Sequence, residues 1–207
     1  MYQKMFKRVI DVVMSLLGLI ILSPIFLFII IAIRLNSHGP ILFKQSRVGK
    51  DKILFKIYKF RTMKIETPKD APTHLLKNPD FFITKVGKFL RKTSLDELPQ
   101  LFNIIKGEMS IIGPRPALWN QYDLVNERDK YRANDIYPGL TGWAQINGRD
   151  ELPIRKKAAL DGEYMKNISF LFDVKCFIGT IFSVVKNDGV VEGGTGSMKN
   201  REAMKND

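Results

Sequence analysis

Two adjacent carboxylates, Asp96 and Glu97, are the side chains of this sequence best placed to do chemistry. They lie at the expected start of a helix, where free N–H groups and the helix dipole favour a phosphate. The cations Arg91 and Lys92 lie just upstream. An aspartate beside cations can stay ionised and attack phosphorus to form an acyl phosphate, while a neighbouring glutamate binds Mg²⁺ or positions a proton. The pattern is therefore compatible with phosphoryl transfer.

A purely local explanation accounts for the same two carboxylates. Ser94 and Glu97 have the spacing of a capping box, and acidic residues are favoured in a first helical turn. With Ser94 as the N-cap, Pro99 would fall inside the helix and leave a carbonyl group unpaired. A helix that starts at Asp96 avoids this conflict. Spacing alone leaves both the catalytic and the capping explanation open.

Arg115 lies between Pro114 and Pro116, whose restricted backbones would hold its guanidinium in a nearly fixed direction. Such an arginine is suited to bidentate phosphate binding. The alternative is an arginine of an ordinary surface loop, which has the same pattern. Residues 139–148 are rich in glycine and allow the backbone to approach a nucleotide closely. The sequence contains no GxxxxGK[ST] motif, which excludes a P-loop.

The segment of residues 12–33 contains no charged residue. At about 1.5 Å per helical residue it reaches roughly 33 Å, enough to cross a hydrocarbon core. We therefore expect membrane contact; a cleaved signal peptide fits less well, because no small-residue cleavage site precedes Arg34. Ser23 and Pro24, in the middle of the segment, predict a kink.

Basic residues flank this segment on both sides, so both ends would prefer the cytoplasmic face. With the kink, this suggests a bent helix that enters one leaflet and returns; a Pro-containing transmembrane helix is an equal alternative. Lys7 and Arg8 are expected to anchor the helix at lipid headgroups. Asp11 lies on the same helical face as Arg8 and predicts an interfacial ion pair.

The remaining elements predict an α+β fold. Two runs rich in Ile, Phe and Tyr, with a glycine-containing turn between them, predict a small β-hairpin over residues 41–63. A proline-containing loop follows at residues 64–80, and residues 138–149 predict a loop around a short extended piece. Apolar periodicity predicts helices at residues 81–92, from about residue 94 or 96 to Gly107, and at 119–131, 154–166 and 170–186.

Composition limits the function further. The 207 residues are 45% hydrophobic and can bury a core, which excludes intrinsic disorder. A net charge of +12, from 33 Lys and Arg against 21 Asp and Glu, predicts an anionic partner: nucleic acid, anionic lipid or a phosphorylated substrate. One cysteine excludes an internal disulfide, and two histidines provide no cluster for structural zinc.

Several motifs, in order along the chain, resemble those of the small monotopic phosphoglycosyl transferases of bacteria, membrane enzymes that start polyprenol-linked glycan assembly. The matching stretches cover most of the chain, and so many motifs in register make the resemblance specific. They are FKR at residues 6–8 with Asp11, SP at 23–24, GPI at 39–41, KIYKFRTM at 56–63, RKTSLDELPQ at 91–100, IGPRP at 112–116 and PGLTGWAQ at 138–145.

The resemblance implies transfer of a phospho-sugar from a UDP-sugar to polyprenol (undecaprenyl) phosphate, with release of UMP. It implies that Asp96 attacks the β-phosphate to form a covalent sugar-phosphate intermediate, which the lipid phosphate resolves. Glu97 matches the acidic partner associated with Mg²⁺, so Asp96 and Glu97 are the expected metal ligands. The cationic phosphate contacts carry over to Arg91 and Arg115, and further substrate contacts carry over to Lys59, Arg149 and Asp161.

The resemblance also implies a division of the chain. Residues 1–38 are expected to form a re-entrant membrane helix, residues 39–190 a compact catalytic domain with amphipathic interfacial helices, and residues 191–207 a Gly-rich tail. The expected location is the cytoplasmic face of the bacterial inner membrane. Expected partners are a UDP-sugar, polyprenol phosphate and anionic membrane lipids, with no nucleic acid. The large N-terminal bundle of some bigger relatives does not occur, so we expect a minimal catalytic unit.

Two other classes of function are weighed against this one. A membrane-anchored basic module that binds nucleic acid or acts as a scaffold would explain the positive charge, but the sequence has no recognised nucleic-acid-binding motif. A catalytically silent relative could serve as an adaptor, and the presence of both Asp96 and Glu97 counts against it. Salt-dependent DNA binding, compared with release of UMP from UDP-sugars, separates the classes.

Overall fold

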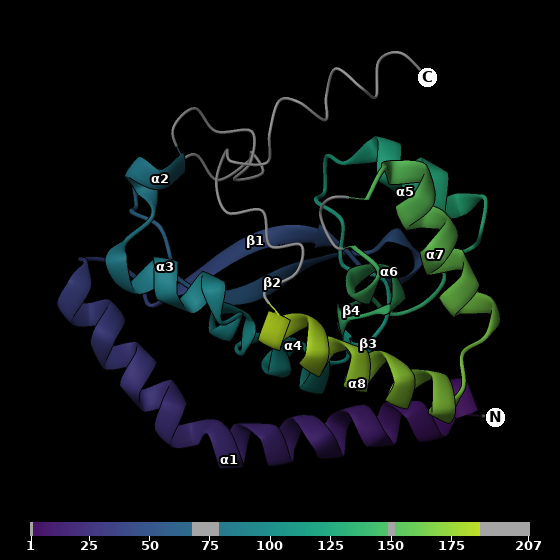
Figure 1. Cartoon of the computed structure of the whole chain (residues 1–207), viewed down its shortest axis with the longest axis horizontal. Coiled ribbons are helices and arrows are strands. Elements are labelled where there is room, and N and C mark those ends of the chain that lie inside the picture. Colours follow the sequence, from purple (N-terminus) through teal and green to yellow (C-terminus); the bar gives the residue numbers. More distant parts are fainter. Residues whose placement is uncertain (1, 68–78, 149–151, 187–207) are drawn as a thin grey trace.

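The chain folds into a mixed α and β structure with one long apolar N-terminal helix and two small sheets, which confirms the mixed fold class. The computed structural model describes residues 2–67, 79–148 and 152–186. Helix α1 runs along one side of the molecule, and the other elements pack on its concave side (Figure 1). The elements are η1 (Tyr2–Phe6), α1 (Lys7–Asn36), β1 (Leu42–Val48), η2 (Lys50–Lys52), β2 (Leu54–Phe60), α2 (Pro79–Phe82), α3 (Lys85–Lys92), η4 (Leu95–Glu97), α4 (Gln100–Lys106), β3 (Ser110–Ile112), α5 (Tyr122–Asp129), β4 (Gly139–Thr141), α6 (Trp143–Ile146), α7 (Ile154–Lys166) and α8 (Phe170–Lys186).

Helix α1 is bent in its middle, as the Ser23–Pro24 pair predicts (Figure 1). Pro24 has no N–H to donate to the carbonyl group of Ile20, four residues earlier. The Ser23 hydroxyl donates to that carbonyl oxygen instead, at 2.8 Å. In an apolar surrounding an unpaired carbonyl would cost several kcal/mol, so the serine makes the proline tolerable there. Among the described helices, α1 is the one long and apolar enough to cross a membrane.

The polar residues at the start of α1 face the protein. The Lys7 ammonium lies 2.6 Å from the Asp173 carboxylate, and only 9% of Lys7 is exposed. The hydroxyl groups of Tyr2 and Tyr164 donate to the same carboxylate, each at 2.6 Å. This cluster joins α1 to α7 and α8. Lys7 is thus in a buried ion pair rather than at the surface, where a headgroup anchor was expected.

The β-hairpin of β1 and β2 is antiparallel and forms as the sequence predicts, with Leu42 opposite Phe60 and Val48 opposite Leu54. Its Phe55 and Ile57 side chains pack on Leu101, Ile104 and Met109, which forms one part of the core. At the other end of β2, Phe60 packs on the second half of α1 and on α3. The hairpin therefore packs on α4 and, through Phe60, on the second half of α1.

Asn103 of α4 fixes the free edge of β2. Its Oδ1 accepts from the Tyr58 N–H at 2.9 Å, and its Nδ2 donates to the Lys56 carbonyl oxygen at 2.8 Å and to Glu108 at 2.6 Å. The side chain is completely buried. It takes the place of a neighbouring strand for one residue pair, and so holds α4 in register with β2.

Several elements differ from the expected ones. The helix expected at residues 81–92 is two helices, because the Thr84 side chain accepts from the Gly87 N–H and starts α3 anew. The helix expected at 119–131 is the shorter α5, because Leu118 forms a β-bridge with Arg47 just before it. In the segment at 138–149, the predicted short extended piece forms as β4, which pairs in parallel with β3, but the helix α6 that follows it was not expected. Helix α7 has the predicted bounds.

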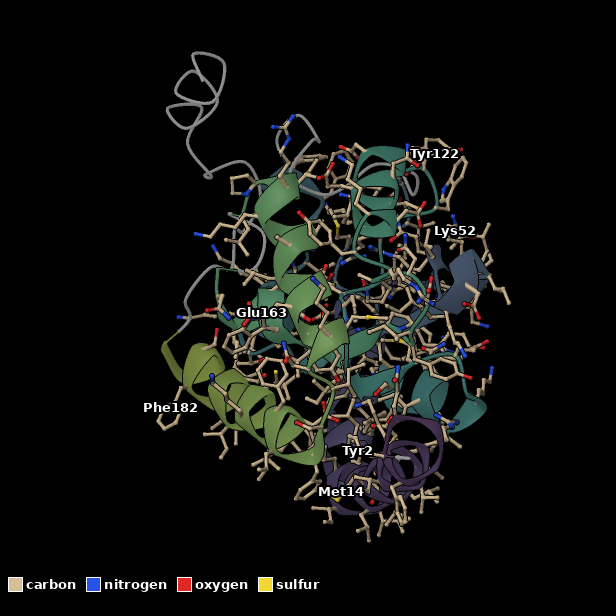
Figure 2. All side chains as sticks on the ribbon, turned by 90° about the vertical axis from the view of Figure 1, so that its right-hand side faces the viewer. Tyr2, Met14, Lys52, Tyr122, Glu163 and Phe182 are labelled. Atoms are coloured by element: carbon tan, nitrogen blue, oxygen red, sulfur yellow. The ribbon has the colours of Figure 1, made fainter. Side chains whose placement is uncertain are left out.

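Helix α8 has the predicted bounds and presents an apolar surface to the outside. Its Asp173 and Cys176 are buried, whereas Leu171 is 78% and Phe182 is 62% exposed. In Figure 2, Phe182 projects outward from α8, and Met14 of α1 lies at the end of the molecule opposite to Tyr122. The exposed apolar residues of α1 and α8 thus gather at one end. Those of α8 are Phe170, Leu171, Val174, Phe177, Ile178, Ile181 and Phe182.

Replacement of Asn103 by alanine should destabilise the fold, since it leaves the Tyr58 N–H and the Lys56 carbonyl group buried without a partner. We expect a loss of about 2–4 kcal/mol, or roughly 5–10 °C in melting temperature in detergent. Asn167→Ala is the matched control, because Asn167 is exposed and water replaces its hydrogen bond to Glu163. Equal melting temperatures of the two variants would show that the edge contact contributes nothing.

Candidate active site

The Asp96–Glu97 pair lies in a short 3₁₀ turn, η4, that precedes α4. Ser94, just before the turn, has a left-handed backbone (φ +56°), and its side chain makes no capping hydrogen bond. Pro99 is the last residue before α4. The capping box and the helix start at Asp96 are therefore both wrong: the proline delays the α-helix, because it cannot donate within the helix. The two carboxylates are left on a turn rather than on a helix.

Two cations from separate segments hold the Glu97 carboxylate. Lys59 of β2 lies 2.6 Å from Glu97 Oε1, and Arg115 Nη2 lies 2.8 Å from the same oxygen. The second guanidinium nitrogen of Arg115 donates to Oε2 at 3.4 Å. Burial alone would raise the pKa of Glu97, but Arg115 and Lys59 outweigh it and hold this pKa well below its ordinary value. Glu97 is therefore ionised, and both of its carboxylate oxygens accept hydrogen bonds.

The Asp96 carboxylate lies in a different environment, although it is the neighbouring residue. It is 9% exposed, and no described side chain forms a hydrogen bond or ion pair with it. Burial raises its pKa above the ordinary value, and the charge of Glu97 adds to this. Lys59, Arg91 and Arg115 are near enough to oppose the shift in part. Asp96 is thus a poorly solvated carboxyl group beside three cations, whose charges favour its ionised form against the effect of burial.

Arg91 reaches this cluster because α3 packs very closely on the segment after β2. A Cβ atom at Gly87 would lie 1.9 Å from the Thr62 carbonyl oxygen, so only glycine permits this approach. Arg91, one turn further along α3, has its Nη1 atom 3.8 Å from the Met63 sulfur. It has no carboxylate partner among the described residues. Its positive charge is therefore available to a ligand.

The cluster can hold a multiply charged anion. Lys59, Arg91 and Arg115 carry three positive charges against the two carboxylates. In the described part of the chain no three His, Cys, Asp or Glu side chains form a metal cage. A divalent cation held by the two carboxylates would need further oxygen ligands, such as those of a phosphorylated substrate.

The other residues singled out from the sequence lie elsewhere. Asp161 of α7 is 1% exposed and forms an ion pair with Arg128 at 2.6 Å, and no contact joins it to the cluster among the described residues. Arg149 lies outside the described residues. Ser23 and Pro24 lie inside α1, where the Ser23 hydroxyl donates to the Ile20 carbonyl oxygen. The structure therefore brings together Lys59, Arg91, Asp96, Glu97 and Arg115.

Two supporting residues were missed in the sequence. Asn103 is a polar residue on the apolar face of α4, between Leu101 and Ile104, and this break in the pattern could have indicated a buried hydrogen-bonding role. Arg128 is 3% exposed, which nothing in the local sequence indicates. Only the fold supplies its partner, from a helix that is distant in sequence.

Proteins similar to this chain are known. Residues 2–187 match the family model described as bacterial sugar transferase. The uncharacterized sugar transferase EpsL of Bacillus subtilis is 41% identical over 184 residues, which is 89% of this chain and 89% of that protein. The chain thus corresponds to nearly the whole of this relative.

Two further relatives carry more specific names. The UDP-glucose:undecaprenyl-phosphate glucose-1-phosphate transferase of Escherichia coli is 42% identical over 187 residues, 86% of this chain and 40% of that protein. The UDP-N-acetylgalactosamine-undecaprenyl-phosphate N-acetylgalactosaminephosphotransferase of Aeromonas hydrophila is 37% identical over 189 residues, 88% of this chain and 44% of that protein. The chain therefore spans less than half the length of these two relatives.

Substitution of the two neighbouring carboxylates should change stability in opposite directions at neutral pH. Asp96→Asn removes a carboxylate whose pKa is raised by folding, so it should raise the melting temperature by about 2–4 °C for each kcal/mol gained. This gain should vanish as the pH falls toward the ordinary aspartate pKa, where the carboxyl is protonated in both states. Glu97→Gln should lower the melting temperature.

Folding lowers the pKa of Glu97. The destabilisation by Glu97→Gln should therefore persist down to the ordinary glutamate pKa of about 4.3 and decrease below it. Thermal denaturation of the wild type and both variants between pH 2.5 and pH 8 measures the two effects. Shifts of the same sign for both variants at neutral pH would contradict the separate environments of Asp96 and Glu97.

Proposed function

We propose that this chain, a phosphotransferase that belongs to the bacterial sugar transferase family, moves a sugar-1-phosphate from a UDP-sugar to undecaprenyl phosphate and releases UMP. The observation that carries the proposal is the buried Asp96 carboxylate, which has no hydrogen-bond partner among the described residues and lies beside three cations. The names of the E. coli and A. hydrophila relatives supply the substrate classes.

Asp96 is the proposed nucleophile. One of its carboxylate oxygens forms a bond to the β-phosphorus of the UDP-sugar, and the bond from that phosphorus to the bridging oxygen breaks. UMP leaves with the electron pair, and the sugar phosphate remains on Asp96 as a mixed anhydride. An oxygen of undecaprenyl phosphate then attacks the same phosphorus and releases the Asp96 carboxylate. Two displacements through one side chain need only one phosphate-binding site.

Arg115 and Lys59 stabilise charge on the phosphates in this scheme. In the free enzyme both cations share the single negative charge of Glu97. The diphosphate of the donor competes for these cations and draws part of their charge away from Glu97. Arg91 adds a further positive charge where UMP departs. Preorganised cations of this kind stabilise the transition state more than the substrate, because negative charge grows on the leaving phosphate.

The residues present fit a Mg²⁺ ion. This ion prefers one or two carboxylates together with phosphate oxygens and water, and Asp96 and Glu97 are adjacent carboxylates at a phosphate site. They would hold the ion, which when bound would neutralise charge on the diphosphate. Lys59 and Arg115 must then release part of the Glu97 carboxylate, so metal and donor should favour each other's binding.

The membrane part of the proposal follows from α1 and α8. The exposed apolar residues of both helices gather at one end of the molecule (Figure 2). We propose that this end sits in the cytoplasmic leaflet, that the bend of α1 returns its C-terminus to the same side, and that anionic lipids contact the basic chain. The catalytic cluster then lies where a lipid-linked phosphate is found.

The transfer is tested by UMP release in nanodiscs that contain undecaprenyl phosphate and Mg²⁺, with UDP-glucose, UDP-N-acetylgalactosamine and other UDP-sugars as donors. The wild type should release UMP only with lipid acceptor and a suitable sugar. Asp96→Asn should lose activity by about 10³-fold or more, because the nucleophile is gone. A single-turnover reaction without acceptor should add the mass of one sugar phosphate to the wild type only.

Asp129→Asn is the control, since Asp129 forms an exposed ion pair with Lys52 and lies outside the cluster. It should retain full activity. Full activity of Asp96→Asn, or UMP release that does not depend on the sugar or the lipid, would overturn the proposed nucleophile.

The topology of α1 is tested with single cysteines in a Cys176→Ala background. Gln3→Cys and His38→Cys place exposed thiols before and after α1. If the helix is re-entrant, a membrane-impermeant maleimide should label both thiols in inverted vesicles and neither in spheroplasts. Labelling of the two positions from opposite sides would instead show a helix that spans the membrane.

A further inference from the structure

The first two turns of α1 make polar contacts with the catalytic domain that a membrane anchor alone does not need. Arg8 and Asp11 both bond to the backbone of the connection between α4 and β3. We propose that Arg8 and Asp11 are positioning residues for the transfer reaction. Through their contacts, the position of α1 in the membrane determines the positions of Glu97 and Arg115. This inference rests on the proposed function.

Arg8 holds the C-terminal end of α4. Its Nη2 donates to the Ile105 carbonyl oxygen at 3.1 Å, and its Nη1 donates to the Met109 carbonyl oxygen at 3.3 Å. The last carbonyl groups of a helix have no partner within the helix, and a cation there is favoured by the helix dipole. Gly107 has a left-handed backbone (φ +89°) and a Cβ there would lie 3.3 Å from Arg8, so the guanidinium fits closely at this turn.

Asp11 holds the start of β3. The strand pairs with β4 along one edge only, so the Ile111 N–H points away from β4. Asp11 Oδ1 accepts from this N–H at 3.1 Å, and Asp11 is only 4% exposed. This contact replaces the ion pair that was expected between Asp11 and Arg8. A carboxylate that bonds a strand N–H from a membrane helix fixes the distance between the two elements.

The connection that α1 holds in this way joins the two halves of the catalytic cluster. Glu97 lies just before α4, and Arg115 lies shortly after β3. The bidentate pair of Glu97 and Arg115 joins the two ends of this unit. A shift of β3 relative to α4 would therefore change the approach of Arg115 to Glu97 and to a bound phosphate. An error of about 1 Å in such a group can cost 10²-fold in rate.

The proposal is tested with Asp11→Ala and Asp11→Asn in nanodiscs. Asparagine keeps an oxygen that can accept from the Ile111 N–H, and alanine does not. Asp11→Ala should raise KM for the UDP-sugar about tenfold, because Arg115 is displaced from the phosphate site, while KM for undecaprenyl phosphate changes less than threefold. Asp11→Asn should restore both values to within about threefold of the wild type.

Two further measurements separate positioning from general damage. Hydrogen–deuterium exchange should increase at residues 110–116 in Asp11→Ala and stay unchanged along the rest of α1, and flotation with vesicles should be unaffected. Ser15→Ala is the matched control: Ser15 lies one turn further along α1 and is completely buried, and its hydroxyl has no hydrogen-bond partner among the described residues. It should leave the kinetics and the exchange of residues 110–116 unchanged.

The outcomes are distinct. Wild-type kinetics for Asp11→Ala would overturn the proposal, and so would a uniform loss of active enzyme that Asp11→Asn does not correct. If the wild type itself shows no lipid-dependent UMP release, the proposed function fails. The exchange of residues 110–116 then still decides whether Asp11 holds β3 in place, and no difference between Asp11→Ala and the wild type would overturn that as well.

Discussion

The rest of the structure depends on the ion pairs that the Glu97 carboxylate forms with two cations. This carboxylate binds Lys59 from the hairpin and Arg115 from the segment after β3, and it lies itself before α4. Three segments that are distant in sequence thus meet at one buried charge. Removing one partner of such a group leaves the others buried without compensation, which makes the arrangement rigid but costly to alter. Among the described residues Asp96 has no hydrogen-bond or ion-pair partner, because Lys59 and Arg115 pair with Glu97 instead.

The sequence predicted those parts of the fold that depend on local pattern. The hairpin, α7, α8 and the end of α4 at Gly107 follow from apolar periodicity and from glycine at a left-handed position. Asp96, Glu97 and Arg115 were found because their motifs are contiguous. The start of α4 was missed, since Ser94 and Pro99 give conflicting local signals and the fold resolves them with a 3₁₀ turn. Family resemblance, rather than spacing, drew Lys59 into the site.

Tertiary contacts decided what the sequence could not. Lys7 and Asp11 have the same local pattern as interfacial residues of any membrane helix, and only the positions of Asp173 and Ile111 turn them inward. Asp161 carries over from the family resemblance, but in the fold it forms a buried ion pair with Arg128, 33 positions earlier in the chain. A charged residue near an apolar segment can therefore either lie at the membrane interface or form a buried contact. The partner that decides between the two lies on another element.

The contact between Lys7 and Asp173 joins residues that are 166 positions apart in the chain. During synthesis the apolar helix emerges first, whereas the carboxylate that neutralises Lys7 emerges near the end. Until then Lys7, Arg8 and Asp11 have only water or lipid headgroups as partners. The membrane helix can thus settle at the bilayer early, but the polar contacts that fix it to the catalytic domain form last. Non-local contacts of this kind slow folding, and the contact of Lys7 with Asp173 forms only after α8 has been synthesised.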